Sequence, residues 1–161
     1  MNDDDIRQAQ TVFEICKSAL DESEWNYDHN DEEMWITCTY TGEDLPIDLY
    51  IKVNAIRQMI IISSRIPVIF PEDKIIDAAL ACSMINSSIV DGSFDLNVKT
   101  GKVYYRMTGC FLESLISKGF FDYMMVNSLR VVEEFNDKLF TLAKGITDLK
   151  QFAKLFSDDS E

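Results

Sequence analysis

The chain has 161 residues, a hydrophobic fraction of 47% and a formal net charge of −13 at pH 7. This length and composition predict one globular domain over 1–161, ordered from about 4 to 156, and they do not fit a disordered chain. The negative charge repels nucleic-acid phosphates and anionic lipid surfaces, so we expect neither nucleic-acid binding nor membrane binding.

The first half of the sequence predicts a helix followed by three strands. Apolar residues recur every three or four positions in the helix and alternate with polar residues in the strands. Trp25 and Tyr27 also alternate and could form a short strand, whereas 28–33 resembles a turn. The continuous apolar run at 59–62 indicates a strand covered on both faces. The expected ranges are about 4–20 for the helix and 34–41, 47–53 and 56–63 for the strands.

The second half predicts a helix, a hairpin, a long helix and a short terminal helix. Pro71 suits the first turn of the first of these helices, and Gly145 suits the C-terminal cap of the long one. The segment 110–117 could be a loop or a short helix, broken near Gly119. The expected ranges are about 71–88, 93–107, 121–144 and 148–156.

Alternation of apolar residues predicts the register of the hairpin, because an even-numbered loop keeps them all on one face. With the turn at Thr100-Gly101, the expected partners are Val98 with Val103, Leu96 with Tyr105, Phe94 with Met107, and Asp95 with Arg106.

The order of elements is therefore α-β-β-β-α-β-β-α with a short extra C-terminal helix. Short links between the strands make a largely antiparallel, five-stranded sheet, and the apolar helix faces must pack against it. The expected fold class is α+β.

Motifs that carry catalysis or metal binding are missing from the sequence. Among the serines none lies in a G-x-S-x-G elbow, and the glycines form no phosphate-binding loop. His29, the one histidine, lies in a polar turn. The acidic cluster at 28–33 departs from a calcium loop, because Glu33 and Thr39 occupy the positions of the required Gly and Glu. We expect no catalytic residues, no cofactor and no metal.

The four cysteines have no metal-ligand spacing and are expected to be free thiols in a reducing compartment. The N-terminal residues lack the features of a secretion signal, and the apolar runs are far shorter than the roughly 20 residues that cross a bilayer. We therefore expect a cytoplasmic protein. The cysteines are Cys16, Cys38, Cys82 and Cys110.

Two groups of large side chains are candidates for binding. The first fills six of the seven positions of 120–126, which is more than one helical face can bury, so it is either the start of a helix buried all round or a protein interface. Its members are Phe120, Phe121, Tyr123, Met124, Met125 and Val126. The second is an aromatic group near the first strands, for which core packing is favoured over a pocket. It contains Trp25, Tyr27, Trp35 and Tyr40.

Several segments together resemble the YbjN domain family of bacterial proteins over about residues 4–156. They are Leu45-Pro46-Ile47, Phe70-Pro71-Glu72, the hairpin from Gly92 to Arg106, and the ending Leu142-Ala143-Lys144-Gly145-Ile146-Thr147. The resemblance implies one YbjN-like domain with a fold similar to that of type III secretion chaperones, which commonly form dimers. Family members are described as sensory-transduction regulators, and no catalytic residues come with the resemblance.

The sequence thus favours a non-catalytic, homodimeric protein-binding module with a chaperone-like or regulatory role and an unidentified protein partner. The alternative is a small-molecule-binding protein or an enzyme, with a carboxylate-lined pocket between the sheet and the helices.

Overall fold

The computed structural model describes residues 3–157, and within them the strands form one antiparallel sheet of six, in the order β1-β2-β3-β4-β6-β5. In chain order the elements are α1 (Asp3–Glu22), β1 (Asp28–Asn30), β2 (Trp35–Thr41), β3 (Pro46–Asn54), β4 (Met59–Ile69), the 3₁₀ turn η1 (Glu72–Lys74), α2 (Ile75–Ser88), β5 (Ser93–Asn97), β6 (Lys102–Cys110), α3 (Lys118–Ala143), α4 (Leu149–Ala153) and the 3₁₀ turn η2 (Lys154–Phe156).

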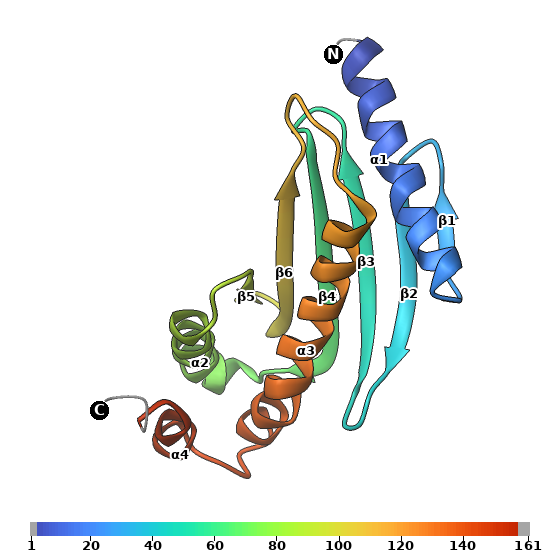
Figure 1. Ribbon diagram of the computed structural model, residues 1–161. Coiled ribbons are helices and arrows are strands. Elements are labelled where there is room, and N and C mark those ends of the chain that lie inside the picture. Colours follow the sequence, from blue (N-terminus) through green and yellow to red (C-terminus); the bar gives the residue numbers. More distant parts are fainter. Residues whose placement is uncertain (1–2, 158–161) are drawn as a thin grey trace.

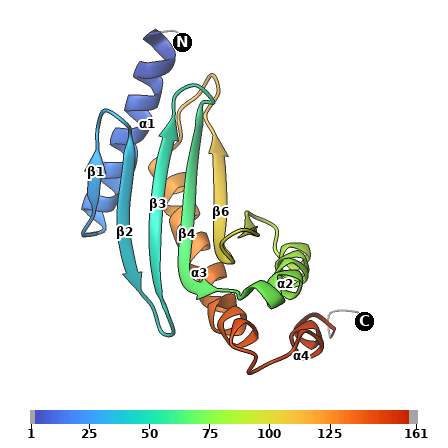
Figure 2. The same ribbon diagram turned by 180° about the vertical axis from the view of Figure 1, so that it is seen from behind.

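Helices cover only one face of this sheet. The long helix α3 packs over β4 and β6, α1 lies beside α3 and contacts β3, and α2 packs against the edge strand β5 (Figure 1). Seen from behind, the strands lie in front of α1 and α3 and no helix crosses them (Figure 2). The fold is α+β, as the sequence predicts.

The alternation of buried and exposed residues along the strands explains why helices cover only one face. In β3 the side chains that point toward the helices are buried, whereas those between them remain partly or fully exposed. The same period of two continues in β4, where Ile60 and Ile62 are buried and Met59 and Ile61 are only partly so. The expectation that the run 59–62 is covered on both faces was therefore wrong, because no segment within residues 3–157 covers the second face.

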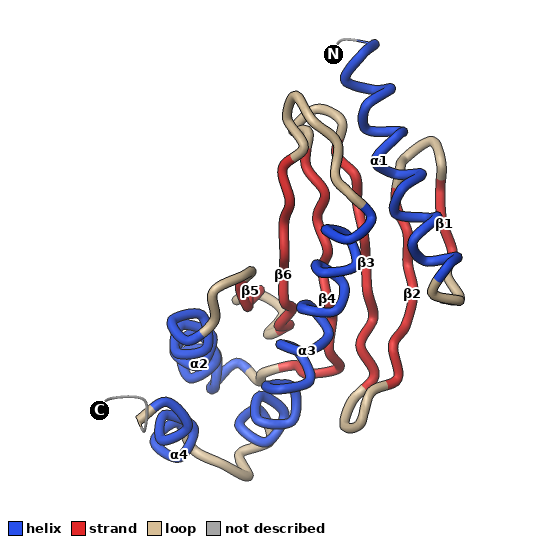
Figure 3. Tube along the Cα trace, viewed as in Figure 1, coloured by secondary structure: helices blue, strands red, loops and turns tan. Residues whose placement is uncertain are grey.

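The sheet has one strand more than the five expected. Asp28–Asn30, expected to be a turn, forms β1 and pairs with β2 (Figure 3). Its three polar residues give no apolar alternation from which a strand could be recognised. The strand β4 is also longer than expected and continues to Ile69 through Pro67. Its pairing with β6 is irregular between Arg65 and Ile69, so the missing N–H of Pro67 interrupts no regular ladder.

The hairpin has a different register from the expected one. Phe94 lies opposite Tyr105 and Leu96 opposite Val103, which shifts the pairing by two residues and places Val98 in the turn. A shift of two preserves the faces of the strands, so the apolar pattern alone could not exclude it. Asp95 and Arg106 still form an ion pair, at 2.7 Å, although they are no longer directly opposite.

The helix boundaries also differ in detail from those expected. Pro71 precedes a 3₁₀ turn, and α2 itself begins at Ile75. The segment after β6 is a loop, and Gly119 lies inside the first turn of α3, where Ser117 caps the helix by accepting from the Phe120 N–H. Gly145 follows α3 with a φ of 70°, the left-handed conformation expected of a helix cap. Residues 1–2 and the acidic end 158–161 lie outside the described part of the chain.

Candidate functional site

The apolar group at 120–126 is divided by the orientation of α3. Phe121, Met124 and Met125 are buried in the core, whereas Phe120, Tyr123 and Val126 are 37%, 48% and 65% exposed. The exposed three recur every third residue along the solvent side of the helix. The buried three fill the core of the protomer, so only the exposed three can contact a partner without rearrangement of the fold.

Local contacts hold two of these exposed side chains in place. The Phe120 ring lies against Gly109 of β6, where a Cβ atom would come within 2.7 Å of the ring. The Tyr123 hydroxyl donates to the carboxylate of Asp91, and this hydrogen bond raises the pKa of Tyr123. The α3 surface is thus a fixed apolar ridge with one polar anchor.

A second apolar surface lies on the outer side of α2. Ile76 is 75% exposed and Leu80 is 45% exposed, and the other exposed residues of the helix are small or hydroxylated: Ala79, Ser83, Ser87 and Ser88. Asp77 is the only charged residue in the helix. This α2 surface, defined by Ile76, Ala79, Leu80 and Ser83, was missed in the sequence, because apolar residues occur on every side of the helix and so give no periodicity.

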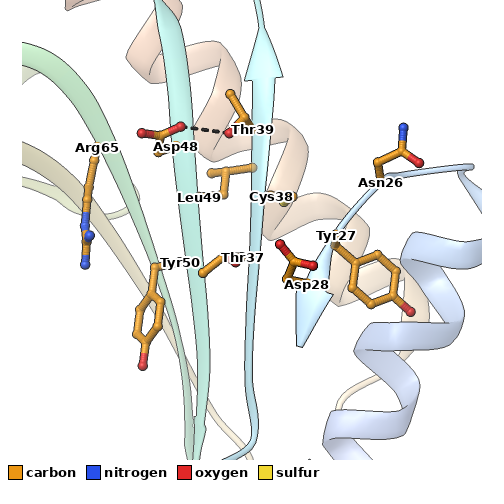
Figure 4. Close-up of a pocket in the computed structure, with 10 residues that line it drawn as sticks. All are labelled: Asn26, Tyr27, Asp28, Thr37, Cys38, Thr39, Asp48, Leu49, Tyr50 and Arg65. Carbon is orange, nitrogen blue, oxygen red and sulfur yellow. Dashed lines mark hydrogen bonds between the residues drawn. The ribbon is translucent and has the colours of Figure 1, made fainter. Parts of the chain in front are cut away.

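A hollow of about 620 Å³ opens where β1 ends beside β2. β1 pairs with β2 only at Trp35, Ile36 and Thr37, so the remaining part of that strand has β3 on one side and no paired strand on the other. Figure 4 shows the gap between this edge and the segment that carries Asn26 and Tyr27. An unpaired strand edge can accept an extended segment of another chain.

The walls of this hollow are polar. The Thr39 hydroxyl donates to the Asp48 carboxylate at 2.8 Å, and Asp28 projects from β1 toward Thr37 (Figure 4). On the uncovered face of the sheet, the guanidinium of Arg65 lies 5.6 Å from the ring centroid of Tyr50, a cation–π arrangement. The hollow therefore offers two carboxylates, hydroxyl groups and one arginine.

The aromatic group near the first strands does not form a common pocket. Trp25, Tyr27 and Tyr40 pack against the edge of the core, which agrees with the favoured packing interpretation. Trp35 instead lies on the uncovered face, with its ring centroid 6.5 Å from that of Tyr50.

Titratable groups in the described residues do not gather into a catalytic or metal-binding cluster. Residues 3–157 contain no group of three or more His, Cys, Asp or Glu side chains placed to hold a metal ion. His29 is exposed, with its Nε2 atom 3.7 Å from the Asp31 carboxylate. Burial raises the pKa of Cys16 to about 12 and the pKa of Cys38 and Cys82 to about 11, which disfavours their thiolates. All four thiols are free, and Cys110 is exposed.

No helix within residues 3–157 is long and apolar enough to cross a bilayer. No protein-family model matches the sequence, and the search of curated proteins found no match. Among solved structures, the chain is similar to YbjN, a proposed transcription regulator from E. coli. The TM-score is 0.56 at 15% sequence identity, and the match covers 76% of this chain and 89% of YbjN. At this identity the likeness concerns the fold alone, and the chain has a YbjN-like fold.

Proposed function

We propose that this protein is a non-catalytic, homodimeric protein-binding module with a regulatory or chaperone-like role. The observation that carries the proposal is the α2 surface. A helix that is apolar on every side is normally buried, yet Ile76 and Leu80 face solvent. The YbjN-like fold supports a regulatory or binding role, since YbjN is described as a proposed transcription regulator.

The α2 surface suits a second copy of the same chain. A charge of −13 makes two copies repel each other, and contact is least costly where the surface carries little charge. The outer side of α2 is such a surface, with Asp77 as the one acid in the helix. Two antiparallel copies of α2 related by a two-fold axis would bury Ile76 and Leu80 of both protomers.

The exposed residues of the α3 ridge are left for the protein partner. Phe120, Tyr123 and Val126 lie on a different helix from the α2 surface and are exposed in the protomer. Apolar and aromatic side chains of this kind are common at the centre of protein interfaces. We assign partner binding to them and self-association to α2.

Sedimentation of the purified protein over a range of concentrations tests the dimer. We expect a dimer for the native chain. Leu80→Glu should raise the dissociation constant of the dimer by about 100-fold or more, because the interface would bury one new carboxylate from each protomer. The matched control is Ile56→Glu, which also replaces an exposed aliphatic side chain by Glu but in the turn between β3 and β4, and which should leave the dimer intact. A strictly monomeric native chain contradicts the proposal.

A separate measurement tests partner binding. Val126→Asp should abolish recovery of a partner by affinity capture from the source cells, while sedimentation still gives a dimer. If the native chain and Val126→Asp recover the same partner equally, the α3 ridge is not the partner-binding surface.

The polar hollow at β1 and β2 favours the alternative function, binding of a small molecule through carboxylates. Asp28 and Asp48 supply the carboxylates, although the hollow lies at the sheet edge and not between the sheet and the helices. A thermal-shift screen with polar metabolites and divalent cations tests this function, and the Asp48→Asn variant should lose any stabilisation that the screen detects.

A further inference from the structure

A second concave region, apart from the α2 surface, lies between the end of α2, one side of α3 and the C-terminal turn η2. It has a volume of about 770 Å³, within the range of small-molecule sites. Its walls combine an apolar part with a polar part. The apolar part contains Ile89, Val131, Phe135, Leu155 and Phe156, and the polar part contains Asp91, Tyr123, Asn127, Arg130, Glu134 and Lys138.

The apolar part of this groove rests on a column of aromatic rings. Phe135 and Phe156 are stacked, with ring centroids 6.1 Å apart and ring planes at 16°. Phe135 in turn contacts Phe94 edge-on, also at 6.1 Å. Because Phe135 and Val131 are themselves buried by their neighbours, this floor is held in place before any ligand arrives.

The polar part contains a guanidinium group with unfilled donors. Arg130 Nη2 donates to Asn127 Oδ1 at 3.0 Å, and Asn127 is itself buried, with its Nδ2 3.5 Å from the Tyr105 hydroxyl. Within residues 3–157 the carboxylate paired with Arg130 is that of Glu134, which lies 3.9 Å from Nη1, beyond hydrogen-bond distance. A buried amide therefore orients Arg130, whose side chain is 66% exposed, and its other N–H donors make no hydrogen bond to residues 3–157 and face solvent.

Within residues 3–157 no carboxylate of the groove accepts a hydrogen bond from these donors, although Glu134 forms a long ion pair with Arg130. Asp91 accepts from Tyr123, and Glu134 does not reach hydrogen-bond distance of Arg130. Two acids and two bases line the groove, so its own charges cancel. The charge of −13 elsewhere on the chain is screened beyond a Debye length of about 8 Å at physiological salt.

We propose that this groove binds a small organic carboxylate with an apolar or aromatic body. The carboxylate accepts two parallel hydrogen bonds from Arg130, a geometry that suits the planar guanidinium. The body lies over Val131, Phe135 and Phe156. This ligand replaces solvent at the Arg130 donors and covers the exposed part of the apolar floor at the same time.

Calorimetric titration with hydrocinnamate and with hydrocinnamyl alcohol, its uncharged counterpart, tests the proposal. At physiological salt we expect saturable, one-to-one binding of the acid and at least tenfold weaker binding of the alcohol. Arg130→Gln should weaken acid binding about tenfold or more and leave alcohol binding unchanged, because it removes only charge-assisted hydrogen bonds. Phe156→Ala should weaken both.

The matched control is Lys150→Gln, which removes a cation from α4 outside the groove and should leave both affinities unchanged. The proposal is overturned by the absence of saturable acid binding up to about 1 mM, by equal affinity for the acid and the alcohol, or by an Arg130→Gln variant that binds the acid as the native chain does. Leu80→Glu should bind the acid normally, which separates this proposal from that of the dimer.

Discussion

At the β5 edge of the sheet, one side chain of α2, that of Asn86, pairs with the backbone of Phe94. Its amide oxygen accepts from the Phe94 N–H at 2.7 Å, and its amide nitrogen donates to the Phe94 carbonyl at 3.0 Å. These are the two bonds that a neighbouring strand would make to Phe94 at the outer edge of β5. Asn86 therefore replaces a strand partner and protects an edge that could otherwise pair with another chain.

Replacement of Asn86 by Ala should lower the free energy of unfolding by about 1–3 kcal/mol, because two partly buried backbone groups lose their partners. Urea denaturation measures the change. Ser87→Ala is the matched control, since its hydroxyl is exposed and bonds only within the helix, and it should change stability by less than about 0.5 kcal/mol. Equal effects of the two substitutions would show that the Asn86 bridge contributes nothing specific.

The buried thiols predict a loss of stability at alkaline pH. The pKa of Cys16 is raised by burial from 9.0 to about 12, so above pH 9 the unfolded chain releases a proton that the folded chain keeps. Stability is therefore fully retained below pH 9 and falls as the pH rises toward 12, by up to about 1.4 kcal/mol per pH unit for this thiol.

Urea denaturation between pH 8 and pH 10.5, under reducing conditions, measures that slope. Cys38 and Cys82 contribute in the same direction, as their pKa values are raised to about 11. Cys16→Ala should make the slope shallower by the contribution of one thiol. A slope that is unchanged in this variant would show that Cys16 does not remain protonated in the folded chain.

At the level of elements, the hairpin register predicts effects of different size for two apolar residues of the hairpin, Leu96 and Val98. Val98 lies in the turn and is exposed, whereas Leu96 lies opposite Val103 and packs against the core. Val98→Asn should therefore change the free energy of unfolding by less than about 0.5 kcal/mol, and Leu96→Asn should lower it by about 1–2 kcal/mol. A larger cost at Val98 would favour the register with Val98 opposite Val103.

Sequence patterns predict those helices and strands in which the spacing of apolar residues fits only one kind of element. The stripe of α1 and the alternation of β3 define those elements because each buries one side only. The pattern fails at β1, which is too short and polar to alternate, and at Pro67, which the irregular pairing of β4 with β6 accommodates. A register shift by two is invisible to alternation, since it preserves the faces.

The candidate surfaces are less predictable than the elements. Rotation of α3 about its axis decides that Phe121 is buried and Val126 exposed, and that rotation depends on contacts with β4 and α1, far away in the sequence. The groove at Arg130 joins three segments that no local pattern connects. A stretch rich in large apolar residues indicates that a surface exists, but only the packed fold determines which side chains form it.

For the whole molecule, the charge of −13 predicts how salt affects self-association. Two like-charged copies repel each other less as the Debye length falls from about 30 Å at 0.01 M salt to about 8 Å at 0.15 M. Since the α2 surface has almost no ion-pairing groups to weaken, added salt should strengthen the dimer. Sedimentation at several salt concentrations checks this, and a dimer that dissociates as salt rises would indicate an interface made of ion pairs.

The placement of α4 has a consequence for experiments in which probes are attached to the protein. The small helix α4 packs against α2, whereas α1 lies at the far side of the molecule (Figures 1 and 2). A two-fold axis at the outer side of α2, perpendicular to the helix, would bring the two copies of α4 close together and keep the two copies of α1 apart. Spin labels on α4 should therefore show strong dipolar coupling between protomers, and labels on the outer side of α1 should show little. The relative strength of these two signals reports which side of the protein lies at the axis.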